Sequence, residues 1–223
     1  MTDSEDDVPQ LSASTLAALQ EYYTEFQERQ DQLTKMMTKG RVNLEENDID
    51  NLNLSEDWQL SQFWYDDETV DVIVRGALQG TEADGKIALI SCPTLYKSLK
   101  RQAGGRTVTL FEYDTRFSMY GADFVSYDYK SPLNLPREMS SMYDLVIADP
   151  PFLSEECLTK TAVTMKFLTK RNIVLCTGAV MEELAGRLLD VHKCRFEPHH
   201  RNNLANEFYC YSNFDFDKSV QLH

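Results

Sequence analysis

A repeated alternation between short apolar runs and helix-like segments is the feature that most constrains the fold. The apolar runs are KIALIS (86–91), TVTLFEYD (107–114), ADFVSYDY (122–129), YDLVIAD (143–149) and NIVLCT (172–177). Segments with a helical spacing of apolar residues lie around them, at 66–80, 96–102, 154–168 and 181–191. Nearly continuous apolar strands separated by helices are typical of a mostly parallel sheet that is covered on both faces.

The last part of the chain breaks this alternation. Two strand candidates, KCRFEP (193–198) and NEFYCYSNF (206–214), follow each other with almost no helix between them, which favours a closing antiparallel hairpin. We therefore predict an α/β fold: a mostly parallel, doubly wound twisted sheet with helices on both faces and a C-terminal antiparallel hairpin. In open sheets of this kind, ligands bind outside the carboxyl ends of the strands.

Composition changes along the chain indicate its organisation. Residues 1–10 are acidic and are predicted to be disordered, and residues 11–39 carry apolar residues at helical spacing. That helix either packs on its own domain or binds a partner. Residues 40–57 are acidic and rich in Asn, which indicates a linker, and the main domain is predicted to cover 58–223.

The overall charge bears on the class of partner. The chain has 223 residues and a formal net charge of -14, so its field repels nucleic-acid phosphates and favours a basic protein as partner. No apolar run approaches the ~20 residues of a membrane span, and the N-terminus lacks the pattern of a secretory signal. We therefore predict a cytoplasmic protein without membrane association. Its five cysteines are spaced singly, which favours reduced thiols in the core.

Polar residues stand at the predicted strand ends, where a ligand is expected. Ser91 and Cys92 follow the first strand, and Glu112 and Asp114 end the second. An acid at the second strand end can accept hydrogen bonds from both hydroxyls of a ribose, and either of these two could serve. Asp128, at the end of the third strand, could accept from the exocyclic amine of an adenine. An acid at a strand end is also common in solvated loops, so each acid alone is weak evidence.

The tetrapeptide Asp149-Pro150-Pro151-Phe152 is the most specific motif of the chain. Two prolines after a buried strand fix both φ angles and remove both N–H donors, which leaves backbone carbonyls free to accept. An amine held between the Asp149 carboxylate and the Pro150 carbonyl has its lone pair aimed, and Phe152 supplies an apolar or cation-π wall. The alternative is a proline-stiffened strand exit with a capping aspartate.

The same tetrapeptide matches the [DNS]PP[YFW] signature of class I S-adenosylmethionine-dependent methyltransferases that act on amines. Longer stretches resemble one subfamily, first described as adenine methyltransferases and later assigned to a lysine of translation elongation factor 1-alpha. These stretches are WQLSQFWY (58–65), LFEYDTRF (110–117), YDLVIADPPFLSEECLTKT (143–161), LCTGAVMEE (175–183) and NLANEFYCYSNF (203–214). The resemblance implies a Rossmann-like methyltransferase fold and a protein-lysine methyltransferase that uses S-adenosylmethionine.

The resemblance also gives the strand-end residues their expected roles. Residues 149 to 152 become the catalytic group, and the cofactor-binding candidates are Ser91, Cys92, Glu112, Asp114, Asp128 and Trp64. Trp64 belongs to the segment 62–65, which either covers the cofactor or packs in the core. The turn ISCPTLYKSL (90–99) departs from the wider superfamily because it has no glycine, so the contacts expected of its first residues need another explanation.

Other readings stay open on the sequence alone. The tetrapeptide by itself also fits an adenine-specific DNA or RNA methyltransferase, although a basic channel or target-recognition domain is not visible. The missing glycine turn leaves room for a non-catalytic scaffold that acts through its N-terminal helix. No metal is expected, because His192, His199 and His200 lack ligand spacing. The stretch HHRNNLANEF (199–208) is expected to line the substrate groove.

Overall fold

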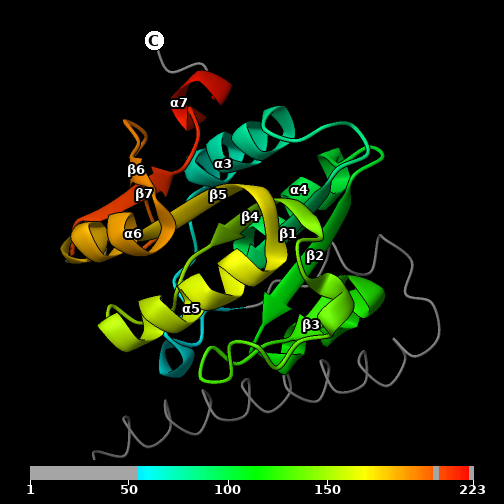
Figure 1. Cartoon of the computed structure of the whole chain (residues 1–223), viewed down its shortest axis with the longest axis horizontal. Coiled ribbons are helices and arrows are strands. Elements are labelled where there is room, and N and C mark those ends of the chain that lie inside the picture. Colours follow the sequence, from blue (N-terminus) through cyan, green and yellow to red (C-terminus); the bar gives the residue numbers. More distant parts are fainter. Residues whose placement is uncertain (1–54, 203–205, 221–223) are drawn as a thin grey trace, which may run out of the picture. The chain divides into compact units, whose positions relative to one another are not determined.

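The computed structural model describes residues 55–202 and 206–220, and it contains a seven-stranded sheet with the order β3-β2-β1-β4-β5-β7-β6 (Figure 1). The predictions made for residues 1–10, for 11–39 and for most of 40–57 lie outside the described residues. The strands are β1 (Lys86–Ile90), β2 (Thr107–Glu112), β3 (Phe124–Ser126), β4 (Tyr143–Ala148), β5 (Thr169–Gly178), β6 (His192–Lys193) and β7 (Phe208–Ser212).

The strand directions agree with the predicted layout. β1 to β5 pair in parallel, whereas β7 pairs antiparallel with both β5 and β6. The α-helices are α3 (Asp67–Gln79), α4 (Thr94–Gln102), α5 (Glu155–Leu168), α6 (Glu182–Leu189) and α7 (Phe216–Ser219). Short 3-10 helices are η1 (Trp58–Leu60), η2 (Thr115–Asp123), η3 (Arg137–Met139) and η4 (Ala179–Met181). This is the predicted α/β architecture with a C-terminal antiparallel pair.

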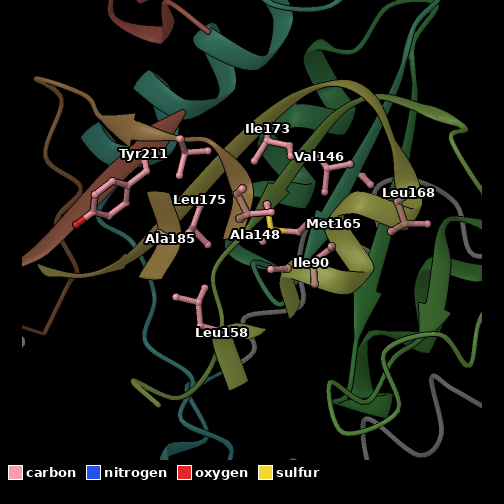
Figure 2. Packing of buried hydrophobic residues seen from close by; sticks show 14 of the residues in the cluster. Ile90, Val146, Ala148, Leu158, Met165, Leu168, Ile173, Leu175, Ala185 and Tyr211 are labelled. Atoms are coloured by element: carbon pink, nitrogen blue, oxygen red, sulfur yellow. The ribbon is translucent and has the colours of Figure 1, made fainter. Parts of the chain in front are cut away.

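The central strands are apolar on both sides because helices cover both faces of the sheet. One face of β1, β4 and β5 packs against α5 and α6, and Figure 2 shows side chains of this cluster between the sheet and the two helices. Its members include Ile90, Val146, Ala148, Leu158, Met165, Ile173, Leu175 and Ala185. The alternate residues of β4, Leu145 and Ile147, are also fully buried. Each such aliphatic side chain contributes roughly 1.5–3 kcal/mol through removal from water.

The helices that border the site begin at residues suited to capping. Asp66 precedes α3 and accepts a hydrogen bond from the Thr69 N–H at 2.8 Å, and Ser154 precedes α5 and accepts from the Cys157 N–H at 3.2 Å. Each cap satisfies a donor that has no partner within the helix, and a cap of this kind contributes typically about 1 kcal/mol. Both helices therefore start just beyond the edge of the sheet where the strand-end residues lie.

Four predicted strands are longer than the observed ones by at least two residues, and one of them is the last strand, which was predicted as 206–214 and covers Phe208–Ser212. The second strand ends at Glu112 rather than at 114, because the Glu112 side chain accepts from the N–H groups of Tyr113 and Asp114. The third covers only Phe124–Ser126 of the predicted 122–129, since 3-10 helix η2 takes the residues before it. The next-to-last covers only His192–Lys193 instead of 193–198.

β6 is shorter than predicted because a residue distant in the sequence bonds the backbone that follows it. The N–H groups of Arg195 and Phe196 donate to the Asp217 carboxylate, so they cannot take part in a ladder with β7. Asp217 belongs to α7, which docks on α3 where Gly76 leaves room for the Phe216 ring. No helix within residues 55–202 and 206–220 is long and apolar enough to cross a membrane.

Candidate active site

A pocket of about 470 Å³ opens at the carboxyl edge of the sheet, which the arrowhead of β2 marks in Figure 1. Its walls come from six parts of the chain: the turn after β1, the ends of β2 and β3, the tetrapeptide after β4, the segment 59–64, and residues 200, 206 and 208. The lining includes Trp64, Ser91, Glu112, Asp128, Asp149, Pro150, Pro151, Phe152, His200 and Phe208. Most of the strand-end residues singled out in the sequence therefore meet in one cavity.

The glycine-free turn after β1 is made by serine. Ser91 lines the pocket with φ at 54°, in the left-handed region where glycine is usual, and its N–H donates to the Phe111 carbonyl at 2.9 Å. Cys92 lies behind the pocket: it is 3% exposed, and its Sγ is 3.6 Å from the Ile147 carbonyl oxygen. The turn thus keeps a tight backbone path without glycine, and its two predicted residues differ in access to the cavity.

Glu112 ends β2 and faces the pocket. Its Oε1 accepts from the N–H groups of Tyr113 and Asp114, at 3.0 and 3.1 Å. Burial, with a smaller contribution from the Asp114 charge, raises the pKa of Glu112 to about 7. Within the described residues no hydrogen bond reaches Oε2, so a ligand hydroxyl that donated to this oxygen would favour the ionised form.

Asp114, the other acid proposed for the same role, is bonded by the protein itself. Its carboxylate accepts from the Arg116 N–H and Nε at 2.9 and 2.7 Å, and from Gln62 Nε2 at 2.9 Å. Arg116 Nη2 also donates to Gln62 Oε1 at 2.9 Å, so the three side chains form a closed group. Asp114 is 5% exposed and does not appear in the pocket wall. Of the two acids, Glu112 is therefore the one placed to meet a ligand.

Asp128 lines the pocket from the turn that follows β3 rather than from the strand itself. Its Oδ1 accepts from the Lys130 N–H at 2.9 Å, which fixes the turn. The Tyr127 ring before it is buried, and its hydroxyl lies 2.9 Å from Thr164 Oγ1. The Tyr129 ring after it lies 5.8 Å from the Phe152 ring. Asp128 and two aromatic rings thus form one side of the cavity.

Asp149 follows β4 directly and lines the pocket. Its N–H donates to the Ile90 carbonyl at 3.0 Å, and its Oδ2 accepts from the Tyr65 hydroxyl at 2.7 Å. Burial raises the pKa of Asp149 to about 7; the hydrogen bond from Tyr65 lowers it, and the charge of Glu112 raises it. Among the described residues only Tyr65 bonds this carboxylate, so Oδ1 is left for a ligand.

The rest of the tetrapeptide completes this side of the pocket. Pro150 is buried, Pro151 is partly exposed, and the Phe152 ring is 42% exposed at the mouth. Leu153 packs against Gly178 at the end of β5, where a Cβ would come within 2.9 Å of its side chain. The exit from β4 is therefore held on both sides, which keeps Asp149 and the Pro150 carbonyl in fixed positions.

The segment before α3 forms a wall of the pocket together with residues from the far end of the chain. The Trp64 N–H donates to Glu56 Oε1 at 2.7 Å, and the Trp64 carbonyl accepts from the Arg201 N–H at 2.8 Å. Tyr65 and His200 form an antiparallel bridge. Trp64 lines the cavity, whereas Tyr65 is 1% exposed and packs in the core. That Trp64 covers the cofactor stays a prediction.

His200 adds an uncharged wall to the cavity. Its ring lies between those of Tyr65 and Phe208, with centroids at 5.0 and 4.8 Å, and burial lowers the pKa of His200 to about 4. The imidazole is therefore neutral at physiological pH. His200, Asn206 and Phe208 are the described residues of the predicted stretch 199–208 that line the pocket.

Sequence reasoning gave no specific role to four residues of this region: Gln62, Tyr65 and His200, which it named only as parts of longer segments, and Arg116. Arg116 stands two residues after Asp114, and that local pairing of opposite charges could have been noticed. Tyr65 and Asp149 are 84 residues apart, so no local pattern links them. His200 was placed in the groove by its stretch alone, without a specific role.

The residues present fit S-adenosylmethionine. The buried Glu112 carboxylate has an oxygen open to the cavity, as a ribose diol requires, and Asp128 offers an acceptor beside aromatic rings. Asp149 stands at the end of β4 and lines the same cavity as Glu112, whose charge raises the pKa of Asp149. The pocket offers hydrogen-bond acceptors, which are carboxylates and carbonyls, and aromatic rings. These groups suit a nucleoside that carries a positively charged group.

Comparisons with known proteins agree with this fit. The chain matches the family described as "Probable N6-adenine methyltransferase" over residues 56–216. It is 50% identical over 216 residues to EEF1A lysine methyltransferase 1 of Gallus gallus, a match that covers 96% of this chain and 98% of that protein. The Homo sapiens protein of the same name is 48% identical over 219 residues, with 96% and 97% coverage.

Among solved structures, the branched-chain polyamine synthase C9 mutein of Thermus thermophilus resembles this chain with a TM-score of 0.56. The two are 14% identical, and the match covers 72% of this chain and 59% of the synthase, so this likeness concerns the fold alone. The extent of the family match and the identity to full-length relatives establish the relationship. The chain therefore belongs to this family of methyltransferases, and its cofactor is S-adenosylmethionine.

Proposed function

We propose that this protein transfers a methyl group from S-adenosylmethionine to a lysine side chain of translation elongation factor 1-alpha. The observation that carries the proposal is the 50% identity, over nearly the whole of both chains, to a relative named EEF1A lysine methyltransferase 1. The formal net charge of -14 supports a basic protein substrate, since opposite charges speed the encounter. The cytoplasm is the proposed location, because translation takes place there.

The catalytic difficulty lies in the charge of the acceptor. A lysine has an ordinary pKa of about 10.4, so forming the neutral amine at pH 7 costs about 4–5 kcal/mol. A carboxylate beside an ammonium group raises the pKa of that group, so Asp149 does not by itself release the proton. The dry pocket and the cofactor's positive charge act in the opposite direction, and the proton leaves to water at the pocket mouth.

The tetrapeptide orients the amine for direct transfer. When bound, S-adenosylmethionine supplies a methyl group on a positively charged sulfur. Oδ1 of Asp149 and the carbonyl of Pro150 accept the two hydrogens of the neutral amine, which turns the nitrogen lone pair toward that methyl group. Phe152, 42% exposed at the mouth, covers the aliphatic stem of the lysine. Most of the acceleration in this scheme comes from positioning.

The cofactor contacts are proposed in the same way. Glu112 accepts from the ribose hydroxyls through Oε2, and Asp128 accepts from the adenine amine. Ser91 faces the methionine end through the turn after β1, and Trp64 covers the bound cofactor from the opposite wall. Cys92 and Asp114 support this arrangement from behind, since both are nearly fully buried and bonded within the protein.

A second candidate is an adenine-specific DNA or RNA methyltransferase, which the printed description of the matched family favours. An adenine amine is uncharged at pH 7 and fits the same acceptors. The acidic balance of the chain opposes it, because such an enzyme must hold a phosphate backbone near the pocket.

The decisive experiment uses labelled S-adenosylmethionine with the purified full chain. One reaction contains elongation factor 1-alpha and the others contain DNA or RNA, and a chain without substrate serves as the blank. The proposal predicts label in the protein, at lysine by mass spectrometry. Label in adenine instead would establish the second candidate, and no label in any reaction would support a non-catalytic scaffold.

A further inference from the structure

The Tyr65 hydroxyl makes the only hydrogen bond to the Asp149 carboxylate among the described residues. The bond is 2.7 Å long and goes to Oδ2, and it joins positions 84 residues apart in the chain. Tyr65 is 1% exposed and sits behind Asp149 rather than in the pocket wall. The hydroxyl thus holds one carboxylate oxygen from the protein side, and no described residue bonds the other oxygen of this pocket-lining aspartate.

The Tyr65 ring is itself held firmly. Its backbone forms an antiparallel bridge with His200, and the centroids of the Tyr65 and His200 rings are 5.0 Å apart. The centroid of the His200 ring lies 4.8 Å from that of Phe208. On either side of Tyr65, the Trp64 carbonyl and the Asp66 N–H make backbone hydrogen bonds to residues 201 and 199. Because these contacts fix the Tyr65 ring, the bonded oxygen of Asp149 adopts the position that the Tyr65 hydroxyl imposes.

We propose that Tyr65 is a positioning residue for methyl transfer, which holds Oδ2 of Asp149 so that Oδ1 faces the acceptor amine. This inference rests on the proposed function, because it assumes that an amine is the acceptor. A carboxylate without this bond rotates about χ2 between orientations, and only one of them places Oδ1 and the Pro150 carbonyl at the two hydrogens of the amine. Loss of the bond therefore lowers the fraction of bound substrate in a reactive geometry.

The same bond opposes the protonation of Asp149. The groups that face this carboxyl are the Tyr65 hydroxyl, the Glu112 carboxyl and the thiols of Cys92 and Cys157. Burial and the Glu112 charge raise the pKa of Asp149, whereas the Tyr65 hydrogen bond lowers it. Removal of the hydroxyl therefore moves the pKa of Asp149 further upward, and a reaction that needs the ionised carboxylate shifts to higher pH.

Tyr65→Phe removes the hydroxyl and keeps the buried ring. We expect kcat to fall roughly 10- to 100-fold, the range seen when a residue that orients a reactive group is lost, with the cofactor Kd nearly unchanged. The acidic limb of the kcat profile moves to higher pH. A kcat and a pH profile equal to those of the wild type would overturn the proposal.

Tyr96→Phe is the matched control. Tyr96 is also buried, and its hydroxyl donates to a carboxylate oxygen of Asp123 over the same 2.7 Å, but it lies outside the pocket wall. Both variants lose one tyrosine–aspartate hydrogen bond, so thermal unfolding reports the structural cost that they share. An equal loss of kcat in the two variants would mean that Tyr65 serves the fold alone, and this outcome rejects the proposal.

A measurement without catalysis separates this inference from the proposed function. Carbon-13 NMR of the Asp149 carboxyl in the ligand-free protein follows its ionisation in the wild type and in both variants. The pKa of Asp149 is expected to rise in Tyr65→Phe and to stay in place in Tyr96→Phe; no change in the first variant overturns the control of Asp149 by Tyr65. A wild-type chain that methylates no amine refutes the proposed function, whatever the titration shows.

Discussion

Two kinds of carboxylate lie at the carboxyl edge of the sheet, and they differ in how completely the protein bonds them. Asp114 has both oxygens engaged by Arg116 and Gln62, whereas Asp149 has one oxygen bonded and one open to the cavity. Glu112 resembles Asp149, since its Oε1 accepts from two backbone N–H groups and no described residue donates to its Oε2. A closed carboxylate stabilises the fold, and a half-bonded one keeps binding capacity for a ligand.

The largest effect is expected at the open carboxylate of Asp149. Asp149→Ala removes an acceptor that orients the amine, and we expect methyl transfer to fall about 100- to 1000-fold, as when one group that stabilises the transition state is lost. Cofactor affinity, measured by calorimetry, stays nearly unchanged because Asp149 meets the substrate. A variant that binds the cofactor much more weakly would instead assign Asp149 to the cofactor.

The closed carboxylate of Asp114 should behave in the opposite way. Asp114→Ala leaves Arg116 without its carboxylate partner in a mostly buried site, which costs about 3 kcal/mol of unfolding free energy. For a chain of this length the melting temperature falls by roughly 6–12 °C. Calorimetric unfolding measures the loss, and cofactor Kd is determined at a temperature where the variant stays folded. A stable variant with poor cofactor binding would erase the contrast between the two kinds of carboxylate.

Cofactor binding tests whether Glu112 belongs with the half-bonded carboxylates. Glu112→Gln keeps the shape but removes the charge, so the hydrogen bonds expected from the ribose weaken and the cofactor Kd rises about 10- to 30-fold. Titration calorimetry gives this value, and the result should hold while the pocket stays folded. An unchanged Kd would mean that the ribose is bound elsewhere.

The pH dependence of the stability of Glu112→Gln provides a second test, because the direction of the change is predicted. Burial raises the pKa of Glu112 from 4.5 to about 7, so the stability linked to this carboxyl is full below about pH 4.5 and is lost as pH rises through 7. A neutral glutamine avoids this loss. Above about pH 7 the ligand-free variant should therefore unfold at the same temperature as the wild type or higher, whereas Asp114→Ala unfolds lower.

The smallest effect concerns the turn after β1. Ser91 has φ at 54°, which costs a residue with a Cβ on the order of 1 kcal/mol. Ser91→Gly should relieve this strain relative to Ser91→Ala, which retains it, and the melting temperature of the glycine variant should be higher by roughly 2–4 °C. Equal melting temperatures would show that the serine conformation carries no such cost.

The sequence predicted those parts of the fold and site that depend on local patterns. β1 and β4 were found within one residue of their ends because both are apolar runs of buried central strands. α3, α4, α5 and α6 were also predicted, since the spacing of their apolar residues is a local pattern. The tetrapeptide at 149–152 stands at the pocket for the same reason, because it ends a strand that the pattern already identified.

The parts that sequence could not predict depend on contacts between distant residues. The choice between Glu112 and Asp114 was left open because both were placed at the end of one strand. The strand stops earlier, at Glu112, whose side chain accepts from the next two N–H groups. The hydrogen bond from Tyr65 to Asp149 joins two segments that come together only in the tertiary structure. The point at which the chain leaves the sheet after β6 depends on Asp217, which is also distant in the sequence.

The bridge between Tyr65 and His200 has a consequence for the order of assembly. One wall of the pocket joins a segment ahead of the first strand to a segment that lies just before the last one. During synthesis the early segment emerges long before its partner, so a nascent chain that has completed β5 still lacks a finished cavity. We therefore expect the cofactor to bind only after translation is nearly complete.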